Sequence, residues 1–285
     1  MPELPEVQTT VNGLNKTVKG RMIVSVETTY KSLYHKGSDN IKDPSFFKKF
    51  RDLVVGQKIL KAERRAKNVL MHLSGGYTIL VHMKMTGHFV YDRPGYPFTR
   101  LKFKLDNTKT LVLSDMRKFA KVTFAKTADI SKSIHLEGLG PEPLEDKFDY
   151  KTFKSQLLKR GTGKIKTVLM DQTLLAGVGN IYSDEILWRA GVHPLSIPKA
   201  IPEKQFKLMF IAMKEVLQKG IDFGGDSMSD YRNIKGERGE FQEHHQAYRR
   251  TGKPCTKKGC GGVITRLVVG ARSAHFCPEH QILFK

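Results

Sequence analysis

The hydrophobic pattern of this chain changes from mostly strand-like before Lys126 to helical in the second half, and that change limits the folds open to it. Between Arg21 and Lys126, short apolar runs alternate with Gly, Asp-Asn and Pro-Gly turns, which is typical of antiparallel strands joined by hairpins. Beyond this region, apolar residues recur at helical spacing over about 150–159, 164–175, 180–190 and 202–218. The pattern predicts an α+β protein, in which an N-terminal antiparallel β-sandwich domain precedes a C-terminal helical domain.

Two further helices and a linker are expected from the same reading of the pattern. The helices fall at 3–18 and about 44–54, where apolar residues share one helical face. Residues 137–149 carry five acids, one base and two prolines against a basic background, which favours an interdomain linker. The predicted boundaries are a sandwich at 1–136, the linker at 137–149, a helical domain at 150–248 and a terminal hairpin at 249–285.

The charge balance indicates a polyanionic partner. Lys and Arg number 49 against 28 Asp and Glu, a net charge of +21, and each phosphate that such a protein neutralises releases a counterion. Nucleic acid is the expected partner rather than a membrane, because no apolar run approaches membrane-spanning length and no basic amphipathic helix carries a large aromatic face. The N-terminus lacks a signal-peptide pattern and only three cysteines occur, so we expect a cytoplasmic protein.

Three cysteines and a histidine near the end of the chain have the spacing of a metal site. They follow the pattern Cys255-x4-Cys260-x16-Cys277-x2-His280. Zn²⁺ accepts a Cys₃His ligand set, and two close pairs separated by a loop let two turns hold one ion. The alternative is three spare thiols beside an incidental histidine, which the lack of any other cysteine disfavours. We expect one structural Zn²⁺, since four protein ligands leave no position open for catalysis.

A pair of helices between 164 and 190 is interrupted by Gly177-Val178-Gly179, after which Asn180 stands where the second helix begins. Asparagine is a favoured N-cap, and glycines before a helix let backbone amides approach an anion closely. The segment predicts a phosphate clamp with Lys164 beside it. An ordinary pair of antiparallel helices, in which the glycines only form the turn, fits the segment nearly as well by itself.

The first six residues, MPELPE, offer a possible catalytic amine. Removal of Met1 would leave the secondary amine of Pro2 as the chain terminus, with the carboxylate of Glu3 next to it. Such an amine can attack a carbonyl-like carbon, and a terminal amino group titrates near pH 8, so part of it is unprotonated at neutral pH. The alternative is that proline and acids only begin a helix, and these six residues alone favour that alternative.

Taken together, these features resemble the formamidopyrimidine-DNA glycosylase family, the bifunctional base-excision enzymes that include endonuclease VIII. The resemblance runs from Pro2 to Gln281. Its motifs are MPELPE at 1–6, RRAKNVL at 64–70, HMKMTG at 82–87, DMRKF at 115–119 and LMDQTLLAGVGNIYSDEIL at 169–187, with the cysteine and histidine cluster. The resemblance implies a catalytic β-sandwich domain at 1–136, a helix-two-turn-helix at 164–190 and a zinc-finger β-hairpin at 249–285.

The resemblance also implies catalytic roles at matching positions. Pro2 would attack C1′ of the damaged nucleotide, Glu3 would protonate the sugar ring oxygen, and Glu6 would be a further acid near the lesion. Lys67 would contact the phosphate beside the lesion. After base loss, β- and then δ-elimination would cleave the strand, with no catalytic metal or redox cofactor.

Further matching positions imply contacts with DNA. A nucleotide flipped out of a duplex leaves a void, and Met85, Arg117 and Phe119 match the residues that fill it. Without the resemblance, core packing would be the preferred interpretation of Met85 and Phe119. Phosphate contacts are expected from His82, Lys164, Asn180 and Arg272.

This chain departs from the family pattern at two places. His280 stands where a fourth cysteine is usual, and the Cys255-x4-Cys260 spacing is longer than the common one. In an expected lesion-capping loop at 224–242, Asp226 and Ser229 replace small hydroxyl and basic residues. The stretch RNIKGERGEFQ at 232–242 has a length like the base-capping loop of the oxidised-purine branch, and together with MPELPE and Met85 it favours oxidised purines as the target.

We therefore expect a bifunctional DNA glycosylase and AP lyase of base-excision repair. It would remove 8-oxoguanine and formamidopyrimidines from duplex DNA through a Schiff base on Pro2, as a monomer associated with the nucleoid and without a membrane partner. Two alternatives stay open. One is a pyrimidine-preferring glycosylase like endonuclease VIII, and the other is a non-enzymatic protein that binds damaged DNA.

Overall fold

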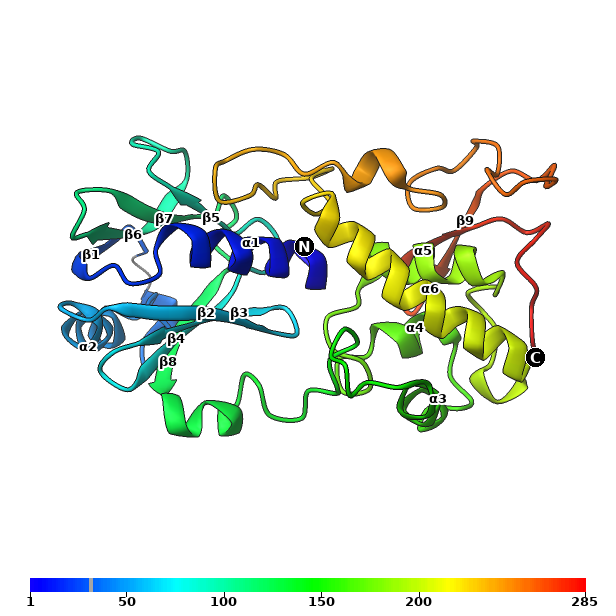
Figure 1. Cartoon of the computed structure of the whole chain (residues 1–285), viewed down its shortest axis with the longest axis horizontal. Coiled ribbons are helices and arrows are strands. Elements are labelled where there is room, and N and C mark those ends of the chain that lie inside the picture. The colour runs from blue at the N-terminus through cyan, green and yellow to red at the C-terminus, as the bar shows by residue number, and fades with distance from the viewer. Residues whose placement is uncertain (31–32) are drawn as a thin grey trace. The chain divides into compact units, whose positions relative to one another are not determined.

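The computed structural model describes residues 1–30 and 33–285, which form two compact units (Figure 1). Unit 1 consists of Met1–Glu137 and Phe223–Glu240, and unit 2 consists of Gly138–Asp222 and Phe241–Lys285. Strands dominate unit 1 and helices dominate unit 2, so the predicted α+β class is confirmed. In the part of the chain that the structure describes, no helix is both long and apolar enough to cross a bilayer.

Unit 1 contains two four-stranded antiparallel sheets. The first has the order β1 (Ile23–Thr28), β6 (Thr99–Leu105), β7 (Thr110–Ser114), β5 (His88–Tyr91). The second has the order β2 (Ile59–Arg65), β3 (Asn68–Leu73), β4 (Tyr77–His82), β8 (Lys121–Lys126). Apolar side chains from both sheets, among them Phe103, Leu113, Ile79 and Val122, belong to one buried core, which confirms the predicted sandwich.

Two helices complete this core. In α1 (Leu4–Thr17), Val7, Val11 and Leu14 lie on one face and are buried, as the helical spacing predicts. Asp43 is the N-cap of the helix α2 (Pro44–Val54), and its carboxylate accepts the Ser45 N–H at 2.7 Å. Two 3₁₀ turns, η1 (Leu33–His35) and η2 (Thr127–Lys132), flank these elements.

Unit 2 is built from helices that end in a two-stranded hairpin. Its elements are α3 (Tyr150–Leu158), α4 (Ile165–Met170), α5 (Asn180–Ala190), η3 (Pro198–Ala200), α6 (Glu203–Asp222), η4 (Phe241–His244), β9 (Thr265–Val269) and β10 (Arg272–Phe276). The helix α4 is shorter than the predicted 164–175, because the Asp171 carboxylate accepts the Thr173 N–H and starts a turn. The helix α6 runs beyond residue 218, where Gln218 donates to Asp222 one turn later.

The segment at the predicted linker lies in unit 2 and packs there. The Gly140 N–H donates to the Gln172 carbonyl, and the ring of Phe148 packs 6.4 Å from that of Phe153, centroid to centroid. Burial of Phe148 and Glu142 shows that residues 138–149 form part of the folded unit rather than a solvated connection.

A second segment, Phe223–Glu240, belongs to unit 1 although helices of unit 2 flank it in the sequence. We call it the inserted segment; the predicted boundaries placed its residues 224–240 with the helical domain. Its Ile234 side chain joins the sandwich core, and the Ile234 carbonyl accepts the Tyr91 N–H at 2.8 Å. The two ends of the segment meet, because the Glu240 N–H donates to the Phe223 carbonyl at 2.8 Å.

Candidate functional site

The N-terminus of α1 is held by a pair of buried carboxylates. Glu3 is the N-cap, and it exchanges hydrogen bonds with Glu6: the Glu3 side chain accepts the Glu6 N–H, and the Glu3 N–H donates to Glu6 Oε2 at 2.7 Å. Pro2 is buried, and Glu3 and Glu6 are 3% and 1% exposed. The helix-start interpretation of this motif is therefore correct as a description of the local structure, and the same arrangement fixes the backbone that carries Pro2.

Glu6 also fastens the inserted segment. Its other oxygen, Oε1, accepts the Asp226 N–H at 2.8 Å, and the Tyr231 hydroxyl donates to the Glu6 carbonyl at 2.9 Å. Burial raises the pKa of Tyr231, which keeps its hydroxyl a donor. A Cβ at Gly225, where φ is +87°, would lie 3.0 Å from Glu6 Cγ, so a glycine is required beside this carboxylate.

Lys67 lies at the tip of the hairpin between β2 and β3. Arg65 pairs with Asn68, so Ala66 and Lys67 form a two-residue turn, with Ala66 at a φ of +51°. Lys67 is 7% exposed. The strand after the turn pairs Asn68 with His82, which brings Lys67 beside His82.

His82 is a neutral donor within a basic group of side chains. Burial, and after it the nearby charges of Lys84, Lys67 and Lys121, lower its pKa to about 3. Its Nδ1 accepts the Lys84 N–H at 3.0 Å, so the proton of the neutral ring sits on Nε2. Three lysines and one imidazole N–H together can hold an anion such as a phosphate.

The three expected void-filling residues are exposed, so the core-packing alternative is wrong for Met85 and Phe119. These two side chains are 38% and 48% exposed. The guanidinium of Arg117 lies 4.7 Å from the centroid of the Phe119 ring, a cation–π contact that orients both. The Arg117 N–H donates to Thr86 Oγ1 at 3.1 Å, which ties this loop to the residue after Met85.

The residues of unit 2 that were expected to clamp phosphate lie on the helix pair and the hairpin. Lys164 is exposed and precedes α4, and Arg272 is exposed at the start of β10. The hairpin turn packs on α4, since a Cβ at Gly270 would lie 2.6 Å from Thr167 Cγ2. The structure therefore brings Arg272 and Lys164 onto neighbouring elements of one unit.

Asn180 is the first residue of α5, and the predicted Asn180 cap is wrong. Gly179 is the N-cap, because its carbonyl already accepts the Ser183 N–H at 3.1 Å. The Gln172 side chain shapes the preceding turn by accepting the Gly177 N–H and donating to the Val178 carbonyl. The Asn180 side-chain oxygen is buried without a hydrogen-bond partner among the described residues.

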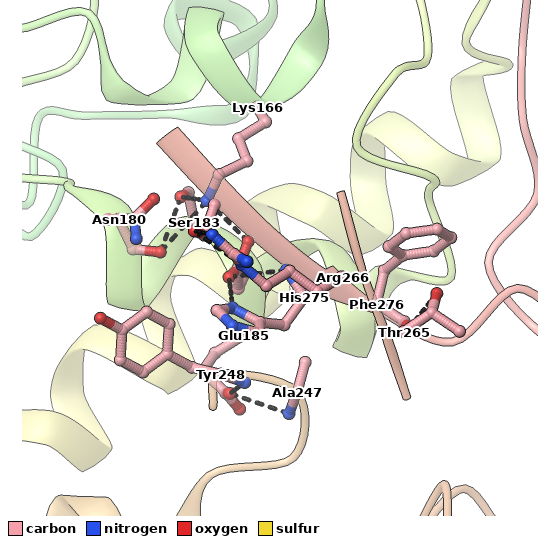
Figure 2. Close-up of polar contacts among 12 residues, drawn as sticks. Lys166, Asn180, Ser183, Glu185, Ala247, Tyr248, Thr265, Arg266, His275 and Phe276 are labelled. Atoms are coloured by element: carbon pink, nitrogen blue, oxygen red, sulfur yellow. Dashed lines mark hydrogen bonds and ion pairs between the residues drawn. The ribbon is translucent and has the colours of Figure 1, made fainter. Parts of the chain in front are cut away.

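Residues that the sequence analysis did not single out join the helix pair to the hairpin (Figure 2). Lys166 is fully buried, and its Nζ lies 2.6 Å from Asp184 Oδ1 and 3.0 Å from Ser183 Oγ. The other oxygen of Asp184 accepts the backbone N–H and the Nδ1–H of His275 at 3.0 and 2.9 Å. Asp184 thus connects α4, α5 and β10 through one carboxylate.

Glu185 makes a second connection from α5. Its carboxylate accepts the backbone N–H groups of Gln246, Ala247 and Tyr248 at 2.8, 3.0 and 2.8 Å. Figure 2 shows the Glu185 side chain directed at the backbone of Ala247 and Tyr248. Burial raises the pKa of Glu185, and these three donors oppose that shift. The turn segment that leads into the hairpin is therefore fixed to α5.

The four expected metal ligands lie together and could hold one metal ion. The ligand atoms of Cys255, Cys260, Cys277 and His280 are all within 4.8 Å of one another. Cys255 Sγ lies 3.3 Å from His280 Nδ1, and the sulfurs of Cys260 and Cys277 are 3.6 Å apart.

The surroundings of this cluster orient its ligands. His280 Nε2 lies 3.0 Å from the Trp188 carbonyl, so Nε2 carries the proton and Nδ1 is left available to bind a metal ion. A Cβ at Gly262 would lie 2.6 Å from Cys277 Sγ, so a side chain there would displace the ligand.

Comparisons with known proteins cover almost the whole chain. Residues 1–122 match the family model described as "Formamidopyrimidine-DNA glycosylase N-terminal domain", and residues 139–232 match "Formamidopyrimidine-DNA glycosylase H2TH domain". The chain is 37% identical to the formamidopyrimidine-DNA glycosylase of Herpetosiphon aurantiacus, covering 99% of this chain and 100% of the relative. It is 36% identical to that of Bacillus subtilis, covering 99% of both.

Solved structures give the same result for the fold. The Lactococcus lactis Fpg in complex with DNA containing an abasic site superposes with a TM-score of 0.86 at 32% identity, over 98% of this chain and 99% of that one. MutM in complex with DNA containing carbocyclic 8-oxo-G superposes with a TM-score of 0.85 at 32% identity, over 99% of this chain and 100% of that one.

Proposed function

This chain belongs to the formamidopyrimidine-DNA glycosylase family and is a DNA glycosylase and AP lyase that acts on damaged DNA, and we propose that it excises oxidised purines from duplex DNA through a Schiff base on Pro2. The observation that carries this proposal is the paired carboxylates at the start of α1. Glu6 holds the Glu3 N–H, and so the peptide that links Pro2 to Glu3 is fixed where the reaction would begin.

The proposed reaction requires a free Pro2 amine. Once Met1 is removed, the Pro2 nitrogen attacks C1′ of the damaged nucleotide, and the bond from C1′ to the base breaks as the base leaves with the bonding electrons. The Pro2 nitrogen passes its N–H proton to the departing base, Glu3 gives a proton to the sugar ring oxygen, and as the ring opens an iminium forms between C1′ and Pro2. The iminium acidifies the neighbouring C2′–H, so the two flanking phosphates leave in turn by β- and δ-elimination.

DNA contacts are proposed from both units. In unit 1, Lys67 and the Nε2–H of His82 would contact the phosphate beside the lesion, while Met85, Arg117 and Phe119 would occupy the space of the flipped nucleotide. In unit 2, Lys164, Asn180 and Arg272 would contact phosphates through the helix pair and the hairpin.

We propose that the cysteine and histidine cluster holds one structural Zn²⁺. With Zn–S bonds of about 2.3 Å, the sulfurs of a tetrahedral site lie about 3.8 Å apart. The 3.6 Å between the sulfurs of Cys260 and Cys277 fits that value. The ion would supply the folding energy of the hairpin that carries Arg272, and its four protein ligands would exclude it from the chemistry.

The inserted segment supports a preference for oxidised purines. Its residues 224–240 cover most of the expected lesion-capping loop, and Glu6 holds it at Asp226 next to the proposed nucleophile. Solved relatives of this fold are complexes with DNA containing Fapy-dG and 8-oxo-G. We propose the same two lesions as substrates here.

Borohydride trapping on duplex DNA that contains 8-oxoguanine tests the mechanism. Intact mass first establishes that Met1 is absent. The wild type should form a covalent adduct, P2G should lose most of it, and P5G serves as the matched control because it keeps the Pro2 amine. Wild-type protein with a verified Pro2 terminus that never traps would refute the Schiff base.

Comparing release of 8-oxoguanine and thymine glycol decides lesion preference, and tight binding without nicking would identify a non-enzymatic binder.

A further inference from the structure

Four large apolar side chains stand exposed on three loops of unit 1. Met85, Phe98, Met116 and Phe119 are 38%, 51%, 45% and 48% exposed, and we call them the apolar edge. Two of them, Met85 and Phe119, belong to the proposed void-filling group. The other two, Phe98 and Met116, have no role in the function proposed above. Soluble proteins rarely gather large apolar side chains on a surface that contacts only water.

One buried carboxylate binds the three loops together. Asp115 is fully buried; its Oδ1 accepts the Thr86 hydroxyl at 2.6 Å, and its Oδ2 accepts the Ala120 N–H at 2.8 Å. The Asp115 N–H donates to the Phe98 carbonyl at 3.0 Å. The residue after Met85, the residue after Phe119 and Phe98 itself are therefore held by a single residue.

Two further side chains hold Asp115 in place. The Tyr30 hydroxyl donates to Asp115 Oδ2 at 2.9 Å, and burial together with the nearby carboxylate raises the pKa of Tyr30, so the phenol stays a donor. Arg100 Nε donates to the Asp115 carbonyl at 3.0 Å. The apolar edge therefore stands on a rigid base.

The backbone at Phe98 is strained. Its φ is +55°, a left-handed conformation that is unusual for a bulky side chain and is retained where the surroundings enforce it. The surroundings do enforce it: Ser114 Oγ donates to the Pro97 carbonyl at 2.8 Å and Thr99 Oγ1 donates to the Tyr96 carbonyl at 2.7 Å. The strain places the Phe98 ring outside the core of the sandwich.

Phe98 and Met116 face the same cavity. It measures about 150 Å³, and Thr86, His88, Asp230 and Arg232 also line it. Thr86 belongs to the loop that carries Met85, and its Oγ1 accepts the Arg117 N–H, so the cavity borders the loops of the proposed void-filling group. Two guanidinium groups lie at the edge, Arg117 on the Phe119 ring and Arg232 at the cavity. Aromatic and thioether groups among arginines suit the flat faces of nucleic-acid bases and the phosphates beside them.

We propose that Phe98 and Met116 contact the bases of duplex DNA where the stack is opened, so that five side chains rather than three take the place of the flipped nucleotide and its neighbours. The inference rests on the proposed function, because only an enzyme that opens the duplex presents unstacked base faces to this edge. Asp115 is a positioning residue in this proposal, since it holds the loops and contacts no DNA.

The variant F98N tests the proposal without unfolding the protein. Asparagine adopts the left-handed conformation more readily than phenylalanine, so the F98N melting temperature should equal or exceed that of the wild type. Binding is measured on duplex DNA with a stable abasic analogue, which requires no chemistry. F98N and M116Q should each bind about tenfold more weakly, the order expected for the loss of one base–aromatic or comparable contact, while F98W should bind like the wild type. L60A is the matched control, because Leu60 is 50% exposed on β2 of the same unit.

Two further readouts separate the possible outcomes. 2-Aminopurine placed on either side of the abasic analogue, in each strand, should become less fluorescent with the wild type than with F98N. The loss of affinity should be smaller on an undamaged duplex. Wild-type affinity for the abasic duplex in both F98N and M116Q would overturn the proposal, and so would an equal loss on undamaged DNA. Failure of Pro2 trapping would remove the Schiff base but would leave these binding results unaffected.

Discussion

Lys166 and Asp184 form a buried ion pair in unit 2, with 2.6 Å between Nζ and Oδ1. The second oxygen of Asp184 holds His275 of the terminal hairpin. A buried ion pair is costly to dehydrate, and its retention is understandable where it fixes the relative position of elements. Here it fixes the two elements that carry Asn180 and Arg272, the proposed phosphate contacts of this unit.

Breaking that pair should destabilise unit 2. In D184N the Lys166 charge would remain buried without its counterion, which costs about 3–5 kcal/mol in comparable cases. Urea unfolding followed by the single Trp188, which lies in unit 2, measures the loss. The matched control is E215Q, which removes the exposed pair with Arg189 and should cost less than about 1 kcal/mol. If D184N and E215Q lose the same stability, the buried pair has no structural role.

Glu6 should affect the reaction more than DNA binding. In E6Q the side chain keeps one carbonyl oxygen, so either the Glu3 N–H or the Asp226 N–H loses its acceptor, at a cost of about 1–3 kcal/mol. We expect single-turnover base release to fall at least tenfold, while affinity for an abasic-analogue duplex stays within about threefold. E27Q, at an exposed glutamate on β1, is the control. An equal fall in both quantities would show that Glu6 acts in DNA binding instead.

His82 should make the stability of unit 1 depend on pH. Its pKa is lowered from 6.5 to about 3, so the unfolded chain takes up a proton below pH 6.5 that the folded protein refuses until about pH 3. This contribution is fully present above pH 6.5 and is lost as the pH falls toward 3. Replacement by glutamine in H82Q should flatten the pH dependence by up to about 1 kcal/mol per pH unit. Unfolding midpoints of the wild type and H82Q at pH 4.5 and 7.5 measure this difference. Equal changes of midpoint with pH in the two proteins would show that His82 does not cause the pH dependence.

Removal of the proposed Zn²⁺ should disorder part of unit 2 and leave unit 1 folded. We expect a chelator to disorder the hairpin at 249–285 and abolish DNA binding, because the hairpin carries Arg272, while unit 1 keeps its cooperative transition. Limited proteolysis and a metal assay follow the two effects. H280C supplies a fourth thiolate and should retain the ion. Undiminished binding by fully metal-free protein would refute the structural role of the ion.

Local patterns in the sequence predicted most of the fold. Short apolar runs between turns marked the strands around Ile79 and Leu111, and helical spacing marked α1 through Val7 and Leu14. The cluster of four metal ligands was predictable from the sequence for the same reason. The ligands occupy only 26 consecutive positions, 255–280, so their spacing alone brings them together.

Contacts between distant parts of the chain were not predictable in this way. Asp184 lies 91 positions from His275, and no local pattern pairs them. The one available signal was Lys166, a lysine placed among buried apolar residues of a short helix. The membership of the inserted segment was missed similarly, because a single apolar residue, Ile234, anchors it in the sandwich. The cap of α5 was assigned to Asn180 from residue preference, whereas the backbone geometry of Gly179 decides it.

The chain passes from one unit to the other after Glu137, again after Asp222 and again after Glu240. A fragment that stops at residue 137 would leave the sandwich core without Ile234, the Glu6 carbonyl without the Tyr231 hydroxyl and the Glu6 carboxylate without the Asp226 N–H. Neither unit can therefore be expressed alone, or exchanged between homologues, by dividing the chain at a single position. Any such dissection must carry an 18-residue stretch across from the other side of the sequence.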